Sequence, residues 1–170
     1  IGISNICGET MSRSRFYGKY RGVVTDNHDP LMQGRLRARV PAVFGDQETG
    51  WALPCTPYGG KNVGFFFIPP VGSNVWIEFE GGSTEVPIWS GCFWGPKEAP
   101  AVTPEVKVIK TGFATMIVKD LPGAGEITIE STTGSKIVMN TSGIQLVNGA
   151  ASVKLTPATV SINDGALEVI

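Results

Sequence analysis

The sequence predicts an all-β protein in two parts, a small barrel of five strands followed by a repeat of short strands. Glycine supplies 22 and proline 12 of the 170 residues, against about an eighth of the residues in average usage, and this excess favours turns. Of the 15 aromatic residues, 14 lie between Phe16 and Trp94. Beyond Gly125, pairs of apolar residues separated by one residue recur at a mean spacing of eight. The chain therefore changes character near residue 100.

The first part reads as short strands separated by turn signals. Residues 34–40 (GRLRARV) place Leu36, Ala38 and Val40 on one face of a strand and three arginines on the other. Residues 74–80 (NVWIEFE) alternate in the same way. We expect strands at residues 19–27, 34–40, 64–68, 74–80 and 87–94. Because closure hides the edges of a short sheet, these strands predict a barrel of the oligonucleotide/oligosaccharide-binding (OB) type.

A connector separates the two parts. Residues 95–104 (GPKEAPAVTP) contain three prolines, which disfavour a helix and suit an extended linker. The predicted organisation is an N-terminal arm at 1–15, the barrel at 16–94, a linker at 95–105 and the repeat at 106–170. The arm is too polar to fold alone, and we expect it to order on a partner.

The second part carries six apolar doublets separated by small and turn-forming residues. One doublet per strand cannot bury its own face within one chain. Three chains around a threefold axis would bury these faces in a narrow apolar core, and a one-chain or two-chain sheet packed on the barrel is the alternative. The predicted trimer core is Ile127, Ile129, Ile137, Met139, Ile144, Leu146, Val153, Leu155, Val160 and Ile162.

Residues for catalysis or metal binding are few. The single histidine, His28, lies in a turn-like Asp-Asn-His-Asp-Pro stretch, and the three cysteines form no CxxC pair. No GxSxG, GxxxxGK[ST] or GxGxxG motif occurs. Glu78 and Glu80 share a predicted strand face, but a solvent-facing strand explains them better than acid/base catalysis. We therefore expect no enzyme activity, no cofactor and no metal.

Charge and hydropathy exclude other classes. The formal net charge is −1, which argues against a polybasic nucleic-acid coat. No apolar run approaches the roughly 20 residues of a membrane span, and the N-terminus does not read as a signal peptide. A basic stretch at residues 10–40, interleaved with aromatic residues, leaves one alternative open, an OB barrel that binds single-stranded nucleic acid.

Several longer motifs are similar to the central spike proteins of contractile tails, the phage baseplate assembly protein V family and its relatives in type VI secretion and other contractile injection systems. In the barrel they are residues 20–25 (YRGVVT), 34–41, 64–72, 75–82 and 87–91. In the C-terminal half they are residues 110–112, 120–123, 127–130 and 134–139. The resemblance covers roughly residues 16–148, and beyond Gly149 only the repeat supports it.

The resemblance implies a homotrimer in which three barrels form a collar and three C-terminal segments wind into a triple-stranded β-helix needle. It implies no reaction. The expected role is a structural spike in the baseplate of a virion or contractile particle, assembled in the bacterial cytoplasm, mounted on a hub protein and puncturing the target envelope. Whether the particle is a phage or another injection system stays open.

Departures from larger relatives refine these expectations. The short linker leaves no room for the lysozyme domain that some spikes carry, and no histidine follows His28 to hold a metal at the tip. The needle would then dock a separate conical tip protein, or end bluntly. Arg35, Arg37 and Arg39 are the candidate hub-docking residues, and Leu167, Val169 and Ile170 are the candidate tip-docking residues.

Overall fold

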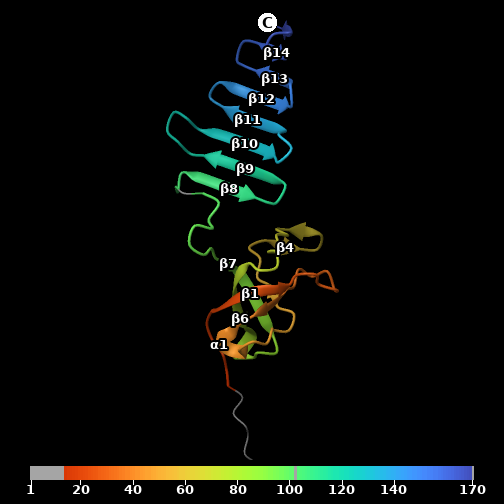
Figure 1. Cartoon of the computed structure of the whole chain (residues 1–170), viewed down its shortest axis with the longest axis vertical. Helices are drawn as coiled ribbons and strands as arrows, with labels where there is room; N and C mark the ends of the chain where they lie inside the picture. Colours follow the sequence, from red (N-terminus) through yellow and green to blue (C-terminus); the bar gives the residue numbers. More distant parts are fainter. Residues whose placement is uncertain (1–13, 102, 170) are drawn as a thin grey trace, which may run out of the picture. The chain divides into compact units, whose positions relative to one another are not determined.

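A computed structural model describes residues 14–101 and 103–169 and divides the chain into two compact units between Gly95 and Pro96. Nearly all regular elements are β-strands, which confirms the all-β prediction (Figure 1). Most of the predicted N-terminal arm lies outside the described residues.

The N-terminal unit is built on one five-stranded sheet in the order β2-β1-β6-β7-β3. β1 pairs antiparallel with β2 and with β6, and β6 pairs antiparallel with β7, whereas β3 pairs parallel with β7. Leu36 and Ala52 exchange two backbone hydrogen bonds of 3.2 and 2.8 Å, which join the two edges of the sheet. The unit is therefore an OB-type barrel. Its elements are β1 Tyr20–Asp26, β2 Arg37–Arg39, α1 Pro41–Phe44, β3 Leu53–Pro54, β6 Asn74–Phe79, the 3-10 turn η1 Glu80–Gly82 and β7 Pro87–Cys92.

The alternating residues of the predicted strands fill the barrel. Leu36, Ala38, Val40, Val75 and Ile77 are fully buried, and their polar neighbours in the sequence face outward. Full burial of a valine, leucine or isoleucine side chain contributes about 1.5–3 kcal/mol. The rest of this core is Val24, Ala52, Phe79 and Trp89. The period-two pattern therefore predicted the inward face correctly.

The expected strand at residues 64–68 is wrong. Only β5 Val63–Gly64 is a strand there, and it forms a two-stranded hairpin with β4 Gly59–Gly60. At Gly64, with φ +150°, a Cβ atom would lie 2.8 Å from the carbonyl oxygen of Tyr58, so the chain crosses its own backbone closely at this point. Pro69 and Pro70 then lack the N–H groups that would extend a ladder. The fifth strand of the barrel is β3 instead, which lies between the predicted strands at residues 34–40 and 64–68.

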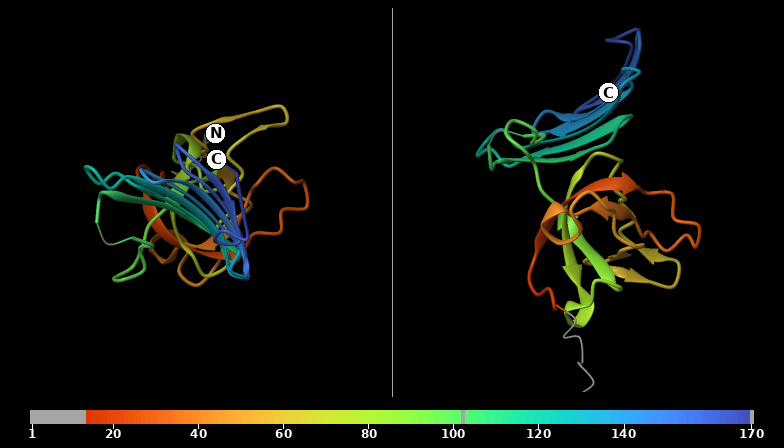
Figure 2. Two further views of the ribbon diagram at one scale, coloured as in Figure 1. Left: turned by 90° about the horizontal axis from the view of Figure 1, so that it is seen from above. Right: turned by 60° about the horizontal axis from the view of Figure 1, so that its bottom comes forward.

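The C-terminal unit is a single eight-stranded sheet in which consecutive strands pair antiparallel, in the order β15 to β8. Figures 1 and 2 show it as one layer of strands, coloured green to blue. Short turns join the strands, so each apolar doublet pairs with the next doublet of the same chain. The β-helix needle of three chains stays a prediction. The strands are β8 Val106–Lys110, β9 Ala114–Lys119, β10 Glu126–Ser131, β11 Lys136–Asn140, β12 Gly143–Asn148, β13 Ala151–Leu155, β14 Val160–Ile162 and β15 Leu167–Val169.

Candidate interaction surfaces

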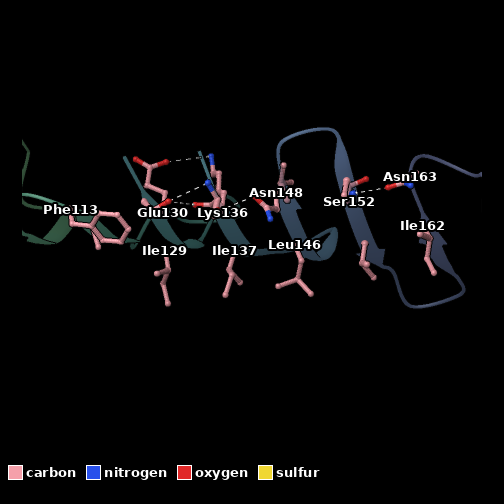
Figure 3. A pocket seen from close by; sticks show the side chains of 16 residues that line it. Phe113, Ile129, Glu130, Lys136, Ile137, Leu146, Asn148, Ser152, Ile162 and Asn163 are labelled. Carbon is pink, nitrogen blue, oxygen red and sulfur yellow. Dashed lines mark hydrogen bonds and ion pairs between the residues drawn. The ribbon is translucent and has the colours of Figure 1, made fainter. Parts of the chain in front are cut away.

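The ten predicted trimer-core residues lie on one face of the C-terminal sheet. Residues that stand opposite each other in an antiparallel pair direct their side chains to the same side. One row runs through Ile127, Met139, Ile144, Leu155 and Val160. A second row, drawn in part in Figure 3, runs through Ile129, Ile137, Leu146, Val153 and Ile162.

This apolar face is uncovered in the single chain. Ile129, Ile144 and Leu146 are 40, 41 and 42% exposed, and the buried core of the protein contains no residue of this unit. Within residues 103–167, Thr128 is the only buried residue. A hollow of about 650 Å³ lies along the second row (Figure 3). A continuous apolar face with exposed isoleucine and leucine side chains marks an interaction site.

Charged residues lie on the opposite face. From β9 to β14, every charged strand residue belongs to it, and Figure 3 shows Glu130 and Lys136 pointing away from the apolar row. Glu126 accepts hydrogen bonds from Lys119 Nζ (2.8 Å) and Thr128 Oγ1 (3.2 Å), and the Lys119 contact holds the pKa of Glu126 below its usual range. The sheet thus has one polar face suited to water and one apolar face suited to a protein partner.

Arg35, Arg37 and Arg39 form the arginine strip of the barrel, and two of them bind partners within the domain. Arg35 donates two hydrogen bonds to Asp29 Oδ1, from Nη2 (2.6 Å) and Nε (3.0 Å). Arg37 pairs with Glu48, and the guanidinium groups of Arg35 and Arg37 each lie 5.6 Å from the ring centroid of Trp51. Arg39 is exposed. Hub docking by the three arginines therefore stays a proposal, with Arg39 the most accessible of them.

Asp29 organises the loop between β1 and β2, a role the sequence analysis missed. Besides Arg35, its carboxylate accepts the backbone N–H groups of Leu31 (3.0 Å), Gln33 (2.7 Å) and Arg35 (3.2 Å). The Arg35 contact, helped by these amides, holds the pKa of Asp29 far below its usual range. Three backbone donors and one guanidinium on a single carboxylate make this loop rigid.

Replacing Asp29 by asparagine should lower the melting temperature of the barrel in a pH-dependent way. Because the pKa of Asp29 is depressed in the folded state, its stabilisation is complete above the unfolded-state pKa of about 3.9. The stabilisation is lost as the pH falls from that value through the folded-state pKa. The deficit of the Asp29→Asn variant should be several degrees at pH 7 and should narrow steadily below about pH 4. Tryptophan fluorescence reports this domain selectively, because all four tryptophans lie within residues 16–94. Asp46→Asn, at an exposed position, is the matched control and should leave the melting temperature unchanged. If the melting-temperature deficit of Asp29→Asn were the same at every pH, the role given to the Asp29 carboxylate would be contradicted.

The predicted tip residues are only partly described. Leu167 is 56% exposed at the edge strand β15. The side chain of Val169, and Ile170 as a whole, lie outside the described part. The tip assignment therefore stays a prediction.

The residues considered for chemistry do not converge on a site. Glu78 pairs with Lys19 at 2.7 Å, and Glu80 begins the 3-10 turn rather than sharing the strand with Glu78. Among the described residues, no group of three His, Cys, Asp or Glu side chains is arranged to hold a metal ion. No helix in the described part of the chain is long and apolar enough to cross a membrane.

Comparison with known families matches both units. The chain combines an OB-type barrel with a sheet that has one uncovered apolar face. Residues 20–94 match the type VI secretion system/phage-baseplate injector OB domain, and residues 106–168 match the phage baseplate V C-terminal trimerisation domain. The chain therefore belongs to the phage baseplate V family of spike proteins, and its second domain supports a homotrimer. No curated protein matches the sequence.

Proposed function

We propose that the protein is the central spike of a contractile tail or related injection system and that it acts mechanically, without catalysis. In this proposal three C-terminal sheets direct their apolar faces toward a common threefold axis and form the needle. The uncovered apolar face, with charges confined to the opposite side from β9 to β14, carries the proposal. Each side chain fully buried on assembly would contribute about 1.5–3 kcal/mol.

Stiffness is the property that the needle needs. Along each sheet, continuous antiparallel ladders hold eight successive strands in register. Bending one sheet would break these backbone hydrogen bonds and would also separate the packed apolar faces of all three chains. We infer that contraction of a surrounding sheath drives the trimer through a target envelope and that the needle transmits the force.

The two ends of the chain would make different contacts. The barrel, through the N-terminal arm and the Arg35, Arg37 and Arg39 strip, would mount the spike on the baseplate hub. The C-terminal end, with Leu167, Val169 and Ile170, would receive a small conical tip protein. The particle would be a virion or another contractile assembly built in the bacterial cytoplasm.

The nucleic-acid alternative is less well supported. An open cationic strip with aromatic stacking platforms is typical of single-strand binding. Here Arg35 and Arg37 are paired with carboxylates and lie against Trp51. At these two arginines, the cation and the aromatic face that a nucleotide would need already contact each other within the domain.

Co-purification tests the proposed contacts. The full chain should retain the baseplate hub protein and the tip protein encoded near it, whereas a chain ending at Gly165 should retain the hub protein alone. Single-stranded DNA at rising salt concentration is the competing ligand. A tight, salt-sensitive complex with DNA in the absence of hub binding would support nucleic-acid binding as the function instead. Equal recovery of the tip protein by both chains would exclude the C-terminal end as its docking site.

A further inference from the structure

The OB domain carries a second apolar surface, which the sequence analysis assigned to a strand. Figure 1 shows the β4–β5 hairpin extending from the barrel. We call the side chains of Tyr58, Val63, Phe65, Phe66 and Phe67 on and after this hairpin the aromatic finger. They are 56, 55, 59, 73 and 60% exposed. The rings of Tyr58, Phe65 and Phe67 form one cluster, whereas Phe66 lies over Gly34. Exposed large apolar side chains gathered on one segment mark an interaction site.

The aromatic finger is held in one shape. Tyr58 and Phe65 meet edge to face with ring centroids 6.2 Å apart, and Phe65 and Phe67 lie 6.4 Å apart. The backbone N–H of Phe65 donates to the carbonyl oxygen of Tyr58 at 2.9 Å. The hydroxyl of Thr56 donates to the carbonyl oxygen of Phe65 at 3.3 Å. A surface ordered before binding loses little entropy on association.

A groove of about 820 Å³ lies beside the finger, and none of its described lining residues is charged. Its other wall includes Met32, which is 88% exposed and has φ +53°, on the loop that Asp29 anchors. Aromatic residues and methionine without charges are typical of the core of a protein interface, and obligate interfaces are more apolar than transient ones. This composition also disfavours a phosphate backbone as the occupant.

We propose that the aromatic fingers of the three copies in the homotrimer pack against one another. The partner is a second and third copy of this chain, because the trimerisation domain would hold three OB domains on linkers (residues 95–105) that reach at most about 40 Å. Such tethering gives local concentrations of the order of millimolar, so even a weak contact would form. Identical patches can meet at a threefold axis, and the rings themselves carry no charge. Lys61, exposed in the turn between β4 and β5, would have to keep its ammonium group in water at the rim of such a contact. The inference rests on the homotrimer and does not depend on envelope puncturing.

Cross-linking of the full-length trimer tests this contact. In a background of Cys7→Ser, Cys55→Ser and Cys92→Ser, Phe66→Cys is treated with a short bismaleimide, and the chains are separated on a denaturing gel. The finger contact predicts covalent dimers, which reach at most two of the three chains because each link joins one pair. Asp46→Cys, exposed on the same domain, should give none.

Light scattering on the same samples separates the possible failures. A trimer whose Phe66→Cys chains stay monomeric on the gel would overturn the proposal while leaving the homotrimer intact. Protection of the introduced thiol from monofunctional maleimide only when hub protein is added would assign the finger to the hub and would also overturn it. Loss of the trimer before cross-linking would remove the premise of both the finger contact and the needle.

Discussion

Replacing Leu146 by aspartate should abolish the trimer and leave a monomeric chain that keeps its β-structure. Leu146 lies in the middle of the second apolar row, between Ile137 and Val153, and is 42% exposed in the single chain. The substitution therefore costs little within one sheet. In a trimer it would place three unpaired carboxylates in an apolar core, and each uncompensated buried charge costs about 3–5 kcal/mol. Light scattering should report one chain instead of three.

The matched control is Lys154→Asp. Lys154 is exposed on the opposite face of the same sheet, one strand away. The variant also introduces a carboxylate, but on the side that stays in water, so the trimer should persist. A trimer that tolerates Leu146→Asp, or one that Lys154→Asp dissociates, would reverse the assignment of the two faces.

Replacing Gly143 by alanine should strongly destabilise the C-terminal sheet. Gly143 begins β12 with φ +134°, and a methyl group there would lie 1.9 Å from the carbonyl oxygen of Leu155. Neither the backbone of β12 nor that of β13 can move away without breaking the ladder between them. We expect a cost of about 3 kcal/mol, at the upper end for overpacking, seen as a lower dissociation temperature of the trimer.

Gly149→Ala provides the comparison. Gly149 also has a positive φ, +60°, in a turn between two strands, but no atom lies within 4 Å of a Cβ built there. Its cost should be limited to the left-handed backbone, about 1 kcal/mol. Equal effects of the two substitutions would mean that β12 and β13 do not approach each other as described.

The alternation of apolar and polar residues predicted the barrel core well, because successive residues of a strand point to opposite faces. Leu36, Ala38 and Val40 are all fully buried, as their spacing required. The C-terminal doublets were equally informative. Short turns between doublets set the antiparallel register, and this register brings apolar residues onto one face.

Non-local pairing was not readable in the same way. β3 is only Leu53–Pro54 and pairs parallel with β7, more than thirty residues further along the chain, so no local period marks it. The apolar run at Phe65–Phe67 resembles a buried strand, since a short apolar run alone does not distinguish burial within the chain from burial against a partner. The alternation placed Arg35 on the surface face of its strand. Its pairing with Asp29 depends on the turn between the two residues, which the alternation does not describe.

The mass of the purified full-length chain in solution tests the central claim most directly. The apolar face of the C-terminal sheet has no cover within one chain, so we expect a particle of three times 18.1 kDa that persists on dilution. Multi-angle light scattering measures this mass without assumptions about shape. A stable monomer of 18.1 kDa that keeps its β-sheet signal would contradict the account, because the exposed isoleucine and leucine face would then need no partner.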